Sequence, residues 1–253
     1  MSLLELQKGI IYGPVNSRRL GRSLGINLLP PSRKLCTFDC VYCQYGCAAP
    51  VSSTRRLAGF PSVSAVMREV EEAILRQQSP PDYLTFSGNG EPTLHPHFPE
   101  IVDEVLRLRD RVCPGARVAL LSNSSRVHRP EIRKAIELLD DPIMKLDAGD
   151  PATMSLISRP VSTITFETII EGLAEMPHLI IQSMIIAGEP QNAEGDAHEA
   201  WLATLARLSP DKVQIYTAER PVAESSVQRV PQEALESLAR HAQESIGIPV
   251  GAY

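Results

Sequence analysis

The segment Cys36-Thr-Phe-Asp-Cys40-Val-Tyr-Cys43 decides which fold and chemistry this 253-residue sequence predicts. Its cysteines follow a C-x3-C-x2-C spacing, which is suited to hold three irons of a 4Fe-4S cluster and to leave the fourth iron open. A ferredoxin supplies a fourth thiolate, whereas an open iron can bind another molecule. The alternative is a structural zinc site. No second C-x2-C pair or H-x3-5-H pair follows in the sequence, although closed zinc sites usually need one.

A second informative segment is Tyr83-Leu-Thr-Phe-Ser-Gly-Asn-Gly-Glu-Pro92. It predicts an apolar strand that ends in a glycine-containing turn, Gly88, Asn89 and Gly90, followed by the carboxylate of Glu91. Glycine has no Cβ, so a ligand can approach such a backbone closely. The alternative is an ordinary turn after a strand.

Short apolar runs alternate with helical patterns along the rest of the sequence. This alternation predicts an α/β fold in which β-α units build a parallel sheet. The predicted strands span residues 23–29, 83–87, 117–122, 142–147, 178–186 and 212–217. The predicted helices span residues 62–77, 99–112, 166–173, 197–208 and 231–246, with one more that begins at Pro130.

Polar residues stand at the carboxyl ends of the later strands, where β/α barrels place their reactive groups. We therefore expect them around one mouth, together with the cysteines and Gly88 to Glu91. They are Ser122, Asn123, Lys145, Asp147, Gln182, Gln214 and Tyr216. Lys145 and Asp147 are two residues apart and so share one face of their strand. We predict catalytic roles for Lys145, Asp147 and Gln182. For the lysine and aspartate the alternative is a salt bridge without a ligand.

Positive charge gathers at the amino terminus. Residues 1–60 hold eight Lys or Arg against two Asp or Glu, although the whole chain has a formal net charge of −5. Arg18, Arg19 and Arg22 lead towards the cysteine segment and would suit tRNA or another phosphate-bearing substrate. The alternative is that these arginines pair with carboxylates of the same protein.

The length and the 43% hydrophobic content predict one domain over residues 1–253. Residues 1–30 would form its basic lead-in and first strand, and residues 231–253 its last helix and tail. Neither a signal peptide nor a membrane span is apparent, and the cysteine triplet favours a reducing compartment, so we expect a cytoplasmic protein. Cys47, Cys113, His95 and His97 are interpreted as ordinary thiols and loop histidines.

The cysteine spacing, with Tyr42 just before the last cysteine, resembles the signature of the radical S-adenosylmethionine (radical SAM) superfamily. The resemblance implies a partial (β/α)6 barrel, and an open iron that binds the amino and carboxylate groups of S-adenosylmethionine. It further implies a reductant such as flavodoxin or ferredoxin, cleavage of the cofactor to methionine and a 5′-deoxyadenosyl radical, and abstraction of a substrate hydrogen by that radical. Cys36, Cys40 and Cys43 would hold the 4Fe-4S cluster. The cofactor would bind to Tyr42, Gly88, Asn89, Gly90, Glu91, Ser122 and Asn123, with Glu91 holding the methionine amino group.

Most of the chain is similar to the branch that contains the archaeal 4-demethylwyosine synthases of tRNA. The residues that carry this similarity are Gly13 to Gly21, Gln44 to Gly46, Ser87 to Pro92, Lys145 to Gly149, Ser158 to Pro160 and Gln214 to Tyr216. Those synthases use a second cluster held by cysteines before the main motif, and this chain has no Cys before Cys36. Two alternatives therefore remain. One is an activating enzyme of glycyl-radical proteins or a small-molecule radical SAM enzyme, although the order Lys145-Leu-Asp147 reverses the usual order of the activating enzymes. The other is a non-catalytic zinc or iron–sulfur module.

Overall fold

The fold is built around one curved sheet, seen in a computed structural model that describes residues 3–47, 50–52 and 58–253. The strands are β1 (Ile11–Ser17), β2 (Gly21–Ile26), β3 (Tyr83–Phe86), β4 (Arg117–Ser122), β5 (Asp141–Lys145), β6 (Ile180–Met184), β7 (Ile186–Gly188), β8 (Lys212–Tyr216), β9 (Val227–Arg229) and β10 (Val250–Ala252). The helices are α1 (Val63–Leu75), α2 (Phe98–Val112), α3 (Pro130–Glu137), α4 (Pro151–Ile157), α5 (Phe166–Ala174), α6 (Gly195–Leu208) and α7 (Gln232–Ile246), with a 3-10 turn η1 (Pro92–Leu94).

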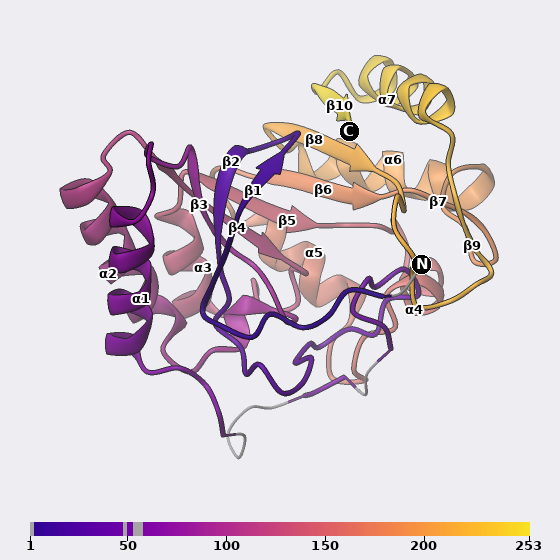
Figure 1. The fold of residues 1–253 in the computed structure, drawn as a ribbon. Helices are drawn as coiled ribbons and strands as arrows, with labels where there is room; N and C mark the ends of the chain where they lie inside the picture. Colours follow the sequence, from indigo (N-terminus) through magenta and orange to yellow (C-terminus); the bar gives the residue numbers. More distant parts are fainter. Residues whose placement is uncertain (1–2, 48–49, 53–57) are drawn as a thin grey trace.

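Eight strands form the sheet in the order β1-β2-β3-β4-β5-β6-β8-β10. Only β1 runs antiparallel to its neighbour; every pair from β2 to β10 is parallel. The sheet curls into an open half-barrel with helices on its outer side, and the β1–β2 hairpin passes in front of the parallel strands in Figure 1. The predicted α/β fold with a partial barrel is confirmed. The six predicted strands correspond to β2, β3, β4, β5, β6 and β8.

The two faces of the sheet differ in chemistry because side chains alternate along each strand. Large apolar residues such as Leu24, Leu84 and Val118 point to the helices and belong to the main core. The inner face carries a polar row, since Lys145 pairs in register with Gln182 and Gln182 with Gln214. The fold thus places three polar side chains from adjacent strands beside one another inside the barrel.

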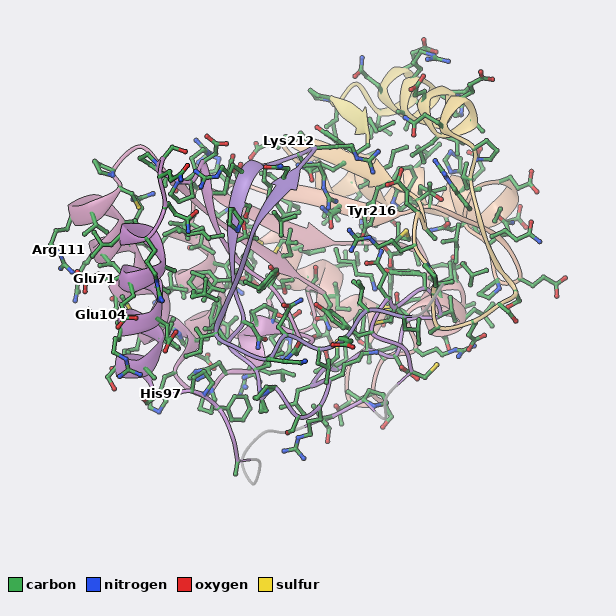
Figure 2. The ribbon with its side chains drawn as sticks, in the orientation of Figure 1. Glu71, His97, Glu104, Arg111, Lys212 and Tyr216 are labelled. Atoms are coloured by element: carbon green, nitrogen blue, oxygen red, sulfur yellow. The ribbon has the colours of Figure 1, made fainter. Side chains whose placement is uncertain are left out.

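Helix boundaries follow local signals. Ser62 caps α1 by accepting a hydrogen bond of 3.2 Å from the amide of Ala65. Pro130 opens α3 at a position that needs no amide donor. On the outer surface α1 and α2 are joined by an ion pair of 3.0 Å between Glu71 and Arg111 (Figure 2).

The structure corrects several predicted boundaries. The strand predicted at 23–29 begins at Gly21 and ends at Ile26, and the unpredicted β1 precedes it. Gly13-Pro14 lies within β1 and reads as a strand breaker, but β1 is an edge strand whose register shifts between Tyr12 and Val15, so the proline is tolerated. The strand predicted at 178–186 is also shorter: β6 stops at Met184, and the chain then leaves the sheet to pair β7 with β9.

Candidate active site

Cys36, Cys40 and Cys43 lie in the loop that follows β2, at the carboxyl end of the sheet. Two isolated bridges hold this loop: Leu35 pairs with Gly90, and Phe38 pairs with Pro160. The loop is therefore fixed at both of its sides to segments far away in the sequence, and all three thiols are half-buried.

Cationic and amide groups surround the thiols. The ammonium of Lys145 lies 3.0 Å from Cys40 Sγ, and the side-chain amide of Asn123 lies 3.3 Å from Cys36 Sγ. Lys34 is buried close by and donates to the carbonyl of Gly46 at 2.8 Å. Cys43 and Cys36 raise the pKa of Lys34, although burial opposes this effect. Both ammonium groups would offset negative charge on metal-bound thiolates.

Burial disfavours ionisation of Cys36 and Cys40 when no metal is bound. It raises the pKa of Cys36 to about 12, and it also raises the pKa of Cys40 in spite of the Lys145 ammonium. A buried thiol ionises readily when a metal replaces its proton. Three half-buried thiols with two nearby ammonium groups and an amide donor thus fit an anionic iron–sulfur cluster.

No three His, Cys, Asp or Glu side chains in residues 3–47, 50–52 and 58–253 converge on a point that one metal ion could occupy.

Gly90 is required by the cysteine loop itself. Its φ of +136° lies in a region that favours glycine, and an added Cβ would stand 1.7 Å from the carbonyl oxygen of Leu35. The sequence suggested that the missing Cβ leaves room for a ligand. The structure gives a second reason, because the glycine backbone packs directly against the residue that precedes Cys36.

Glu91 joins the glycine turn to the end of β4. Its two carboxylate oxygens accept hydrogen bonds from the amide and hydroxyl of Thr93, from the hydroxyl of Ser122 and from the amide of Asn123, at 2.6–3.1 Å. The side chain is 1% exposed, and burial raises its pKa although these four donors oppose the shift. Asn89 is likewise buried, and its side-chain amide donates to the carbonyls of Gln7 and Pro30. Glu91 thus holds the glycine turn to the end of β4, and Asn89 holds it to the segments that contain Gln7 and Pro30.

Lys145 and Asp147 form a buried ion pair of 2.9 Å beside Cys40. Asp147 also accepts hydrogen bonds from the Tyr42 hydroxyl and from the amide of Met184. The Lys145 ammonium lies over the rings of Phe38 and Tyr42, 4.9 and 5.1 Å from their centres. The pair therefore links the cysteine loop to β5 and β6.

A cavity of about 350 Å³ opens in front of this framework. Among the residues predicted around the mouth, six line it: Tyr42, Cys43, Gly88, Gly90, Gln182 and Tyr216. Its other lining residues are Leu4, Tyr12, Arg19, Gln44, Tyr45, Ser87, Leu121 and Met184. The structure thus brings the cysteine loop, the glycine turn and the inner face of the sheet around one space.

Other predicted residues lie outside that cavity. Asn123, Lys145 and Asp147 line a small neighbouring space of about 10 Å³ under Phe38. His95 Nε2 donates a hydrogen bond to the carbonyl of Pro61, and His97 Nδ1 lies 3.1 Å from the carboxylate of Glu100. Cys47 is exposed and Cys113 is buried at the end of α2.

Sequence reasoning missed Tyr12, whose hydroxyl lies 2.5 Å from that of Ser87, and it did not predict that Arg19 lines this cavity. No local signal in the sequence identifies the position of either side chain.

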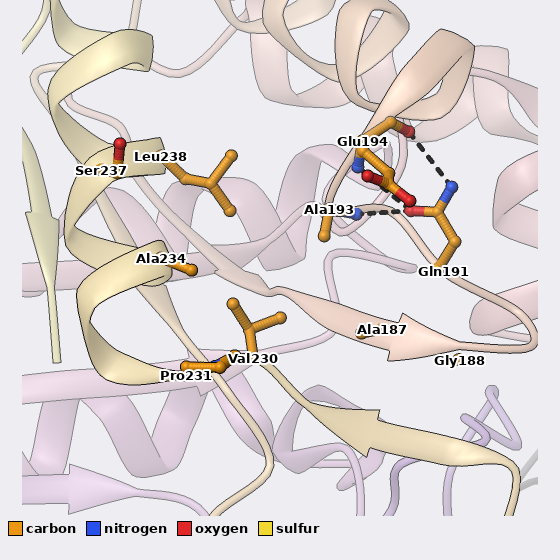
Figure 3. Close-up of a pocket in the computed structure, with 10 residues that line it drawn as sticks. All are labelled: Ala187, Gly188, Gln191, Ala193, Glu194, Val230, Pro231, Ala234, Ser237 and Leu238. Carbon is orange, nitrogen blue, oxygen red and sulfur yellow. Dashed lines mark hydrogen bonds between the residues drawn. The ribbon is translucent and has the colours of Figure 1, made fainter.

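A larger cavity, of about 520 Å³, lies away from the cysteines (Figure 3). Its walls are β7, the segment before α6, and α7. They carry mostly small or apolar side chains such as Ala187, Val230 and Leu238. Its described lining residues include no Cys, Lys or Arg.

Within the part of the chain that the structure describes, no helix combines the length and the apolar character needed to span a bilayer.

Comparison with known proteins agrees with this geometry. The sequence profile of the Radical SAM superfamily matches residues 33–201. The chain is 34% identical over 244 residues to the UPF0026 protein MJ1312 of Methanocaldococcus jannaschii, covering 94% of this chain and 72% of that protein. It is 29% identical over 249 residues to a protein named GTPase Obg of Brachyspira hyodysenteriae, covering 97% of this chain but only 35% of that protein.

The fold is also similar to solved structures. The structure of TYW1 with a lysine–pyruvate adduct superposes with a TM-score of 0.63 at 16% identity, covering 88% of this chain and 73% of that one. TYW1 is a 4-demethylwyosine synthase, so the predicted resemblance to that branch is confirmed in the fold. The superfamily implies S-adenosylmethionine and an iron–sulfur cluster as cofactors. Because the matched segment contains the cysteine loop, the glycine turn and most of the parallel sheet, the chain belongs to the radical SAM superfamily and, with its archaeal relative, to the UPF0026 proteins.

Proposed function

We propose that this protein is a radical SAM enzyme that binds one 4Fe-4S cluster through Cys36, Cys40 and Cys43. The observation that carries the proposal is the common cavity. Cys43, the glycine turn and the inner faces of β4, β6 and β8 all border it, so a cofactor held at the cysteine loop would meet a substrate there. When bound, the cluster and S-adenosylmethionine supply reductive cleavage of the cofactor to a 5′-deoxyadenosyl radical that abstracts a substrate hydrogen.

The chain's own residues would hold and enclose these groups. Asn123 and Lys145 donate towards the sulfurs of Cys36 and Cys40, which would stabilise ligated thiolates. Gly88 and Gly90 line the cavity, and because they lack a Cβ the turn can pack closely against Asn27 and Leu35. Tyr42 is held by Asp147 and covers the space beside Cys43.

Anaerobic reconstitution tests this proposal directly. We expect about four irons and four sulfides per chain, and formation of 5′-deoxyadenosine when dithionite and S-adenosylmethionine are added. A protein that binds one zinc and no iron, or that takes up the cluster but never cleaves the cofactor, would contradict the proposal.

The substrate is proposed to carry a phosphate or another anionic group, with tRNA as one candidate, and flavodoxin or ferredoxin is proposed as the reductant. The contacts of Arg18, Arg19 and Arg22 support binding of an anionic group by one arginine, and not a continuous RNA-binding surface formed by all three. Arg18 pairs with Glu219 at 2.7 Å, and Arg22 donates to Ser79 and Gln77. Only Arg19 faces the cavity.

The ammonium of Lys145 is expected to set the reduction potential of the cluster. Lys145→Gln removes a positive charge 3.0 Å from Cys40 Sγ, and a positive charge favours the reduced, more negative cluster. We expect the midpoint potential to fall by on the order of 100 mV, the size of a unit-charge effect at an effective dielectric constant near 20. A redox titration followed by electron paramagnetic resonance measures this change.

Lys212→Gln is the matched control for Lys145→Gln. Lys212 begins β8 at the opposite end of the barrel and pairs with Asp141 at 3.7 Å (Figure 2). Equal midpoint potentials in Lys145→Gln and Lys212→Gln would show that the buried ammonium does not act on the cluster.

A further inference from the structure

Arg19 occupies an unusual position at the tip of the β1–β2 hairpin. The next residue, Leu20, is buried against Ala119, Ile143 and Ile180 on the inner face of the sheet, and it anchors the tip inside the barrel. Arg19, which is half-buried, lines the cavity. Its guanidinium carbon lies 4.8 Å from the centre of the Tyr216 ring, at the end of β8.

The guanidinium of Arg19 has an unsatisfied donor. Its Nη1 is buried and has no hydrogen-bond partner among the described residues. The residues that line the cavity in the described structure include no Asp or Glu. Burial raises the pKa of Tyr216 to about 12, so its hydroxyl stays protonated at neutral pH and does not balance the charge. A buried cationic donor without a partner costs folding free energy, which indicates that a partner arrives from outside.

The buried guanidinium donor without a partner is a feature of Arg19 that Arg18 and Arg22 do not share. Arg18 is about half exposed and has its carboxylate partner, Glu219. The guanidinium of Arg22 donates hydrogen bonds to Ser79, Pro80 and Gln77. Arg19 alone combines confinement in the cavity with a free donor.

The surroundings of Arg19 favour a small anionic group. Stacking on Tyr216 orients the planar guanidinium, and such a fork matches the two oxygens of a carboxylate or a phosphate. Gln182 also lines the cavity, at the same β6–β8 side as Tyr216, and its side-chain amide contacts Gln214 at 3.2 Å. The glycine turn, by contrast, borders the cavity from the end of β3. Arg19 is thus placed to bind a second molecule beside one held at the cysteine loop.

We propose that Arg19 is a specificity-determining residue that binds a carboxylate or phosphate group of the substrate inside the barrel. This inference rests on the proposed function, because it assigns to the same cavity the chemical class of the molecule on which the enzyme acts.

Anion-dependent stabilisation tests the site without relying on turnover. The reconstituted protein with S-adenosylmethionine, and separately the protein without cluster, is melted in increasing sodium acetate or sodium phosphate, with sodium chloride at the same ionic strength as reference. We expect the melting temperature of the wild type to rise saturably with acetate, with phosphate or with both, since a ligand that binds only the folded state stabilises it. The anion that acts at lower concentration identifies the group as carboxylate or phosphate.

Arg19→Gln and Arg18→Gln form a matched pair that removes the same charge from adjacent positions. We expect Arg19→Gln to weaken the apparent anion affinity about tenfold or more, and Arg18→Gln to respond like the wild type. Because the free Nη1 donor is a cost to the unliganded fold, Arg19→Gln should melt at the same temperature as the wild type or higher when no anion is present. A purely structural arginine would instead lower that temperature when replaced.

Three outcomes would overturn the inference. They are a wild type that responds to neither anion beyond chloride, an Arg19→Gln protein that responds like Arg18→Gln, and an Arg19→Gln protein that loses affinity for S-adenosylmethionine by equilibrium dialysis. The last would assign Arg19 to the cofactor's own carboxylate. Failure of the proposed function is recognised separately, by a wild type that takes up no cluster while its anion response persists.

Discussion

Cys36→Ala, Cys40→Ala and Cys43→Ala should each lose most of the bound iron and all cleavage of S-adenosylmethionine. The three thiols lie in one loop fixed by the Leu35–Gly90 and Phe38–Pro160 bridges, and a cubane with an open iron has no spare protein ligand. Iron and sulfide per chain, the visible absorption of the reconstituted protein and 5′-deoxyadenosine formation measure the loss.

The other two cysteines of the chain provide matched controls. Cys47 is exposed four residues after Cys43, and Cys113 is buried in the helical layer at the end of α2. Cys47→Ala and Cys113→Ala should keep the wild-type iron content and activity. A Cys47→Ala protein without iron, or a Cys36→Ala protein with a full cluster, would show that the ligands have been assigned wrongly.

The features that could be predicted from the sequence are those that depend only on short stretches of the chain. Three cysteines within eight residues define a ligand set by spacing alone. These six buried parallel strands are short apolar runs between turn signals, so they were recognisable: β2, β3, β4, β5, β6 and β8. The polar row of Lys145, Gln182 and Gln214 also followed, since charged or amide side chains interrupt otherwise apolar runs.

What could not be predicted depends on contacts between distant residues. The guanidinium of Arg19 lies over Tyr216, and both the hairpin and the end of β8 must be placed before that contact exists. Within β1, Gly13-Pro14 gives the local signal of a turn. A proline is tolerated in this strand because β1 lies at the edge of the sheet. Glu91 accepts hydrogen bonds from Ser122 and Asn123, at the end of the next strand. Glu91, which the sequence motif assigns to a ligand contact, therefore also holds the glycine turn to the end of β4.

The bracing role of Glu91 leads to a prediction of large effect on stability. Glu91 is 1% exposed. Glu91→Ala removes the acceptor of four hydrogen bonds, which come from the amide and hydroxyl of Thr93, the hydroxyl of Ser122 and the amide of Asn123. Each buried donor without a partner costs about 1–3 kcal/mol, and these four act as one network, so we expect the free energy of unfolding to fall by about 3–5 kcal/mol. Urea denaturation of the protein without cluster measures it.

Glu100→Ala is the control for Glu91→Ala. Glu100 lies on the surface of α2, where its carboxylate contacts only the exposed side chain of His97 among the described hydrogen bonds and ion pairs. Its replacement should change the free energy of unfolding by less than about 0.5 kcal/mol.

The cluster should respond to Glu91→Ala as well. The amide of Asn123 that Glu91 holds belongs to the residue whose side chain reaches Cys36 Sγ at 3.3 Å. Loss of the brace is therefore expected to lower iron retention together with stability. If Glu91→Ala were as stable as Glu100→Ala and kept its iron, but bound S-adenosylmethionine more weakly, the carboxylate would act on the methionine amino group, as the family resemblance implies, and not as a brace.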